Sequence, residues 1–116
     1  MLTNSMLELA RETRKKIRGV FRERVDTIAG YDFVDESNRH TFKLDFLVYG
    51  FAGVRFIYEN DLFEIHILLN LNKEKVISKP ISHYSEISDW DSYLKEIMLE
   101  IESHIPEKYL KAKGWI

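Results

Sequence analysis

Three consecutive stretches of alternating apolar and polar residues, at 40–49, 54–59 and 62–70, constrain the fold of this chain more than any other feature. Successive side chains of a β-strand point to opposite faces, so each stretch predicts a strand with one apolar face. The connections between the stretches are short and contain Gly, Asn or Asp, which favours consecutive antiparallel strands. The apolar residues of the first and last stretches are Phe42, Leu44, Phe46 and Val48, then Phe63, Ile65, Ile67 and Leu69.

Apolar residues at helical spacing lie on both sides of these strands. Ser5 and Glu8 have the spacing of a capping box, and the stripe that follows predicts a long N-terminal helix ending near Gly30. A second stripe predicts a helix with Ser88 as its N-cap, and Pro106 breaks it or starts a short further helix. The two stripes are Met6, Ala10, Thr13, Ile17, Val20, Phe21, Val25 and Ile28, then Trp90, Tyr93, Leu94, Ile97, Met98, Ile101 and Ile105.

Two weaker strand signals complete the pattern, at 31–35 and at 74–78, the second following a turn at 71–73. Pro80 ends the second signal, and 80–87 reads as a loop. The sequence therefore predicts a single α+β domain, 1–116, with an N-terminal helix, a four- to five-stranded antiparallel β-meander, a C-terminal helix and a short helix.

Composition narrows the functional classes. The 116 residues carry a net charge of -2 and no cysteine, which excludes a thiol nucleophile and a cysteine metal site. No apolar run approaches the ~20 residues of a membrane span, and the first apolar run is too interrupted for a signal peptide. We expect a cytoplasmic protein without a membrane partner.

The four histidines, His40, His66, His83 and His104, lack the close spacing of metal-ligand pairs. Glu64 and His66 share one strand face, and the polar outer face of a strand explains the pair more simply than a catalytic base does. No phosphate-binding loop or nucleophile motif is present. We therefore favour a non-enzyme without metal or cofactor, with an enzyme of unknown class as an alternative.

Charge is distributed unevenly along the chain. Four cations of the predicted first helix are separated by four, three and four residues and so share one face, with Arg14 beside them. This stripe is a candidate contact for anions or nucleic acid, or else a solvated face paired through Glu12 and Asp26. Its members are Arg11, Lys15, Arg18 and Arg22.

The second helix has the opposite sign on its outer face. Asp89, Glu96 and Glu100 lie together there and provide solubility or contact a basic partner.

A set of apolar residues falls on the strand face opposite the main apolar set. A helix covering each sheet face is one explanation for them, and a partner or second copy of the chain is the other. If both helices lie on the same sheet face, we expect a homodimer through the uncovered one. The four residues are Leu47, Tyr49, Ile57 and Leu68.

Apolar residues on both sheet faces and segregated charge together favour a non-catalytic protein-binding module that neutralises or regulates a partner, or pairs with itself. Small immunity and antitoxin proteins are often of this size and α+β build, an analogy of size alone. Nucleic-acid binding through the basic stripe is the alternative.

Overall fold

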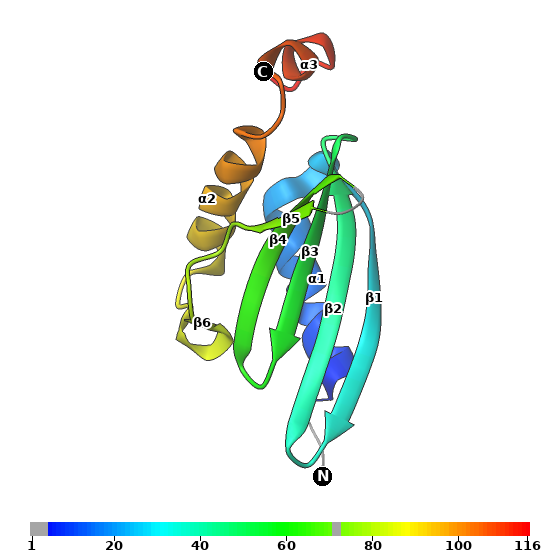
Figure 1. Ribbon diagram of the computed structural model, residues 1–116, viewed down its shortest axis with the longest axis vertical. Helices are drawn as coiled ribbons and strands as arrows, with labels where there is room; N and C mark the ends of the chain where they lie inside the picture. The colour runs from blue at the N-terminus through cyan, green and yellow to red at the C-terminus, as the bar shows by residue number, and fades with distance from the viewer. Residues whose placement is uncertain (1–4, 71–72) are drawn as a thin grey trace.

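The strands form one antiparallel sheet in the computed structural model, which describes residues 5–70 and 73–116. The first long helix lies behind the sheet in Figure 1, and the second packs beside the first at one edge of the sheet. The fold class predicted from the sequence is confirmed. In chain order the elements are α1 Met6–Phe21, the 3₁₀ turn η1 Arg22–Arg24, β1 Val25–Glu36, β2 Arg39–Val48, β3 Ala52–Glu59, β4 Leu62–Asn70, β5 Lys73–Val76, β6 Ser82–His83, the 3₁₀ turn η2 Tyr84–Glu86, α2 Trp90–Glu102 and α3 Glu107–Ala112.

The sheet is a meander. Strands β1 to β5 pair in sequence order, each antiparallel to the next, and β6 pairs with the first residues of β4. Register is continuous from β2 to β3 and from β3 to β4, whereas β1 shifts register twice, between Val25 and Ile28 and between Tyr31 and Val34. The three predicted strands thus form the centre of the sheet.

The alternating apolar residues of the central strands line the face that the helices cover. Ten of the side chains there are buried, and their alternation along each strand places them on one side of the sheet. Leu69 differs, because it lies near the end of β4 and is 48% exposed. The ten buried residues are Phe42, Leu44, Phe46, Val48, Val54, Phe56, Tyr58, Phe63, Ile65 and Ile67.

The helices reach the sheet through the predicted stripes. Ser5 is the N-cap of helix α1, since its hydroxyl accepts from the amide of Glu8, and the helix buries Ala10 and Ile17 against the sheet. The N-cap of helix α2 is Asp89 and not the predicted Ser88, because the Asp89 carboxylate accepts from the amide of Ser92.

Helix α3 lies beyond one end of the sheet (Figure 1). The Tyr109 hydroxyl donates to the carbonyl of Tyr49 at 3.1 Å, and the Trp115 ring meets the Tyr49 ring edge-on. Leu110 is buried. These contacts attach the C-terminal end of the chain to the turn between β2 and β3.

The prediction that the first helix continues to Gly30 is wrong. The helix ends at Phe21, and Arg22 takes a positive φ of 55° that turns the chain into β1. Val25 and Ile28 are both buried although they are three residues apart in a strand, because the register shift between them is a β-bulge. A bulged strand can therefore imitate helical spacing.

Other observed boundaries also differ from the predicted ones. The strand predicted at 31–35 is part of the twelve-residue β1, and the strand predicted at 74–78 is β5, four residues long. The predicted loop 80–87 contains β6 and η2. The turn predicted at 71–73 lies largely outside the described residues. No helix within 5–70 and 73–116 has the length and apolarity to span a membrane.

Candidate functional site

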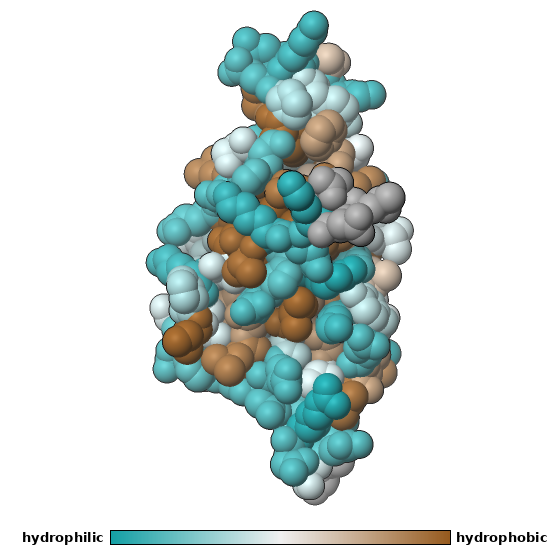
Figure 2. All heavy atoms as spheres, in the orientation of Figure 1, coloured by the Kyte–Doolittle hydropathy of each residue, from teal (hydrophilic) through white to brown (hydrophobic). Residues whose placement is uncertain are grey.

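The sheet face opposite α1 and α2 carries no helix of the described chain, so its side chains form one broad surface. We call this surface the open face. Figure 2 looks onto it from the same side as Figure 1 and shows a mainly hydrophilic surface interrupted by separate apolar patches. Asp45, Arg55 and His66 are cross-strand neighbours in the middle of this face.

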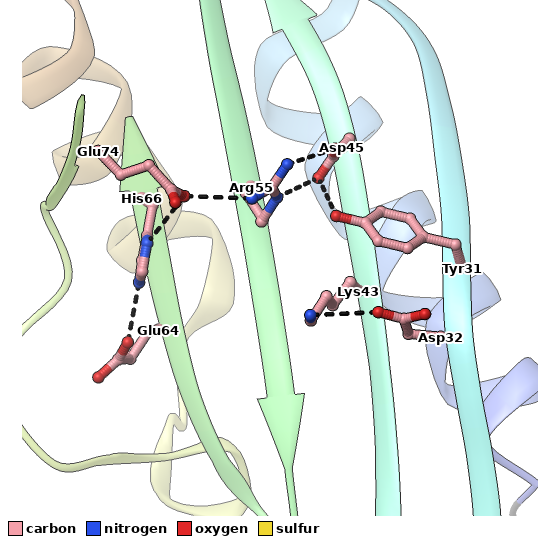
Figure 3. Close-up of polar contacts among 8 residues, drawn as sticks. All are labelled: Tyr31, Asp32, Lys43, Asp45, Arg55, Glu64, His66 and Glu74. Atoms are coloured by element: carbon pink, nitrogen blue, oxygen red, sulfur yellow. Dashed lines mark hydrogen bonds and ion pairs between the residues drawn. The ribbon is translucent and has the colours of Figure 1, made fainter. Parts of the chain in front are cut away.

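Arg55 is the centre of a polar network on the open face (Figure 3). Its Nε and Nη2 donate to the two oxygens of Asp45 at 2.9 and 3.1 Å, and its Nη1 donates to Glu74 at 3.3 Å. The Tyr31 hydroxyl donates to the same Asp45 carboxylate at 3.0 Å. A bidentate guanidinium–carboxylate pair fixes both side chains in orientation as well as in charge.

The network continues to β4 through a histidine. In His66, Nδ1 lies 3.3 Å from Glu74 Oε1 and Nε2 lies 2.8 Å from Glu64 Oε1. Both ring nitrogens of His66 therefore face carboxylate oxygens of the same chain. The pair that sequence analysis named as an enzyme alternative, Glu64 and His66, is thus part of a longer row of mutual contacts across the sheet.

Two groups of the network have shifted pKa values. Hydrogen bonding to Asp45 raises the pKa of Arg55, so the guanidinium stays charged at every accessible pH. Burial, then the hydrogen bond to Asp45, raises the pKa of Tyr31 above its ordinary value. Nearby, Lys43 and Asp32 form a separate pair at 3.2 Å. The central cations of the open face are therefore all matched by carboxylates.

The apolar residues predicted for this face divide around the network. Leu47 is 39% exposed and lies across Gly53 from Leu68 toward one end of the strands, whereas Ile57 lies on the other side of the network. Tyr49 does not belong to the set: it is buried, with a φ of 59°, and its hydroxyl donates to Glu102 of α2. The remaining three residues do not form one continuous patch.

The basic stripe lies on α1, on the other side of the sheet from the open face. Arg11, Lys15 and Arg18 are exposed, and none has a carboxylate within ion-pair distance among the described residues. The pairs expected through Glu12 and Asp26 are likewise not formed within residues 5–70 and 73–116. Arg22 is exposed but lies past the helix end, in η1, so the stripe on the helix itself has three members.

The acidic set of α2 is largely engaged within the chain. Asp89 caps the helix, and hydrogen bonds from Ser92 lower the pKa of its carboxyl group. Glu100 lies 3.4 Å from His104, one turn away. Glu96 has no ion pair with a described residue. Only one of the three carboxylates is thus left for an outside contact.

The remaining histidines also lie beside carboxylates. His40 is 2.9 Å from Asp35, and His83 is 3.4 Å from Asp61. Among the side chains of the described segments, no group of three or more His, Cys, Asp or Glu is arranged to hold a metal ion.

Sequence analysis missed Tyr31, Asp45, Arg55 and Glu74 as members of one network. Their strand positions alternate as required, but only the register across four pairs of strands brings them together. Comparisons with protein-family models, with curated proteins and with solved structures gave no match. The functional argument therefore depends on the geometry of this chain.

Proposed function

We propose that this chain is a non-catalytic protein-binding module that docks an acidic surface of a partner protein onto α1. The observation that supports it is the cluster of Arg11, Lys15 and Arg18, three exposed cations one turn apart without a carboxylate partner among the described residues. Unpaired charges on one face raise the rate of encounter with an oppositely charged surface and select against like-charged ones.

The shape of the stripe supports a compact partner. Between residues 11 and 18 a helix rises about 10 Å, at about 1.5 Å per residue. Three cations over that length match a small group of carboxylates on a folded protein. Helix α1 as a whole has five Lys or Arg against two Glu, so it is basic along its length.

Nucleic acid fits the same surface less well. Proteins that bind DNA through its backbone commonly neutralise about six to ten phosphates, and this stripe offers half that number or fewer. Helix α2 packs beside α1 and has four acidic residues against one Lys, so a long polyanion crossing α1 meets repulsion from its neighbour. The chain as a whole is also acidic.

The test compares two variants with the same net charge. In one, Arg11, Lys15 and Arg18 become Gln, and in the matched control the scattered exposed lysines Lys75, Lys95 and Lys108 become Gln. Proteins captured by the immobilised wild type from a lysate of its source are identified, purified and titrated against all three chains by calorimetry. Capture selects candidates, and the titration decides.

We expect the stripe variant to lose affinity by about tenfold or more, the control by about twofold or less, and wild-type affinity to fall with added salt. Equal binding by the two variants contradicts the proposal. The proposal is also contradicted if gel shifts show that the wild type binds RNA or DNA, that the stripe variant loses this binding, and that binding of protein is unchanged.

A further inference from the structure

Ile81 combines two unfavourable features. It has a φ of 50°, in the left-handed region where a β-branched side chain is strained, and its side chain is 82% exposed. The strain is therefore not offset by burial within this chain. Strained backbone of this kind is held by the surrounding structure and clusters at functional sites such as ligand clamps.

The residues around Ile81 hold it in place. Ser82 on its C-terminal side pairs with Phe63 of β4, and the Ser82 hydroxyl donates to the carbonyl of Lys79 at 2.7 Å. Pro80 on the other side has a fixed φ. The segment thus presents the Ile81 side chain to solvent from a defined backbone, which lowers the entropic cost of using it as an anchor.

A hollow lies beside this segment on the open face. It has a volume of about 370 Å³, the space of roughly a dozen water molecules, so a four-carbon side chain can enter it. Leu62 and Phe63, which line it, pair with His83 and Ser82, the two residues that follow Ile81. The hollow is lined by Ile57, Glu59, Asn60, Leu62, Phe63 and Glu64.

We propose that this corner of the sheet is a two-fold contact between two copies of the chain, in which Ile81 of each copy inserts into the hollow of the other. Two-fold symmetry places the projecting side chain of each copy opposite the hollow of the other copy when both features lie side by side on one surface. Such a contact is complete with two copies and adds no third. Figure 2 shows apolar surface at this edge of the molecule, where β6 lies in Figure 1.

Charge also favours a second copy over another partner. Lys79, two residues before Ile81, and Glu59, at the rim of the hollow, are both exposed, and neither has an ion pair with a described residue. Reciprocal insertion brings Lys79 of each copy toward Glu59 of the other. The same chain thus supplies an anchor, a receiving hollow and a matching pair of charges.

The proposal is independent of the docking surface on α1, which lies on the other side of the sheet. The two are tested by different substitutions, so the failure of one leaves the other standing.

The experiment measures the mass of the full-length chain by sedimentation equilibrium at concentrations up to about 1 mM, where even a weak contact is populated. We expect a monomer–dimer equilibrium without larger species. Ile81→Gly removes the anchor and relieves the left-handed strain, since glycine adopts positive φ freely. It should therefore weaken the dimer about tenfold or more while raising the melting temperature of the monomer.

Matched controls separate this contact from general stickiness. Leu99→Gly and Leu47→Ser remove other exposed leucines and should leave the dimerisation constant within about twofold. Lys79→Glu and Glu59→Lys should each weaken the dimer, and the double variant should recover most of the loss. A wild type that stays monomeric throughout, or a dimer that Ile81→Gly leaves intact, overturns the proposal.

Discussion

The open face of the sheet and the outer face of α1 both carry rows of charged side chains, but only those of the open face are matched within the chain. Arg55 has carboxylates on both sides, in Asp45 and Glu74. Lys15 and its neighbours on α1 have none within ion-pair distance among the described residues. Charged side chains thus serve different ends on the two surfaces.

The difference shows how a structural charge can be distinguished from an available one. A cation enclosed by carboxylates lowers the folding free energy and presents little field to a partner. An exposed, clustered cation contributes little to stability and retains its field for binding. The network of the open face should therefore respond to substitution in stability, and the stripe on α1 in binding.

The largest expected effect is on the free energy of unfolding, and it is tested at two adjacent residues that lie on opposite faces of the sheet. Phe46→Ala should destabilise the protein by about 3–5 kcal/mol, because Phe46 is buried under the helices. Leu47→Ala, on the open face, should cost less than about 1 kcal/mol. Urea denaturation measures both. Similar losses would mean that the open face is covered in solution.

Next in size is the centre of the network. Arg55→Met should cost about 1–2 kcal/mol, because it leaves Asp45 without its bidentate partner while keeping an apolar stem in place of the arginine stem. Lys43→Met is the control, since Lys43 has a single, more exposed partner, and should cost under about 0.5 kcal/mol. Equal costs in denaturation would show that the network adds nothing beyond isolated surface pairs.

A smaller effect is expected on how the folding stability depends on pH. Because the folded state raises the pKa of Tyr31, the neutral phenol stabilises the fold fully below about pH 10, and this contribution is lost as pH rises through the raised pKa. Tyr31→Phe removes the ionisation. The stability of the variant should therefore fall less steeply than that of the wild type as the pH rises from about 10 through the raised pKa.

Urea denaturation across that range measures the two slopes, and other tyrosines contribute equally to both proteins. Parallel curves would contradict the pKa assigned to Tyr31. At neutral pH the variant should lose about 0.5–1.5 kcal/mol with the hydrogen bond to Asp45.

The smallest effect has the opposite sign. Lys15 lies one helical turn from both Arg11 and Arg18, so Lys15→Gln relieves repulsion between like charges and should stabilise the protein by about 0.2–0.5 kcal/mol. The gain should vanish in high salt, where exposed charges are screened. A clear loss of stability in thermal denaturation would mean that Lys15 has a structural partner after all.

Periodicity along the chain predicted the strands at the centre of the sheet because their two faces differ so clearly in polarity. It failed where a non-glycine residue takes positive φ or a strand bulges. Arg22 ends α1 early, and Tyr49 turns from the open face toward Glu102. Both residues depart from the conformations that their types prefer, so tertiary packing overrides local preference at these positions.

The candidate sites also differ in whether the sequence could predict them. The stripe of Arg11, Lys15 and Arg18 was visible in the sequence because one helix carries all of it. The Arg55 network and the Ile81 contact were not, because they depend on strand register and on a backbone angle. Sequence spacing identifies sites built on one element better than sites assembled from several.

The two bulges of β1 have a consequence for self-assembly into fibrils. Strand β1 is twelve residues long and pairs only with β2 among the described strands, so its outer edge is open to another chain. The register shifts leave just four residues, Ile28 to Tyr31, in regular pairing between them. Amyloid spines need about six or seven regular residues. The bulges, with charged Asp32 inside one of them, therefore protect the longest edge of the sheet against templated aggregation.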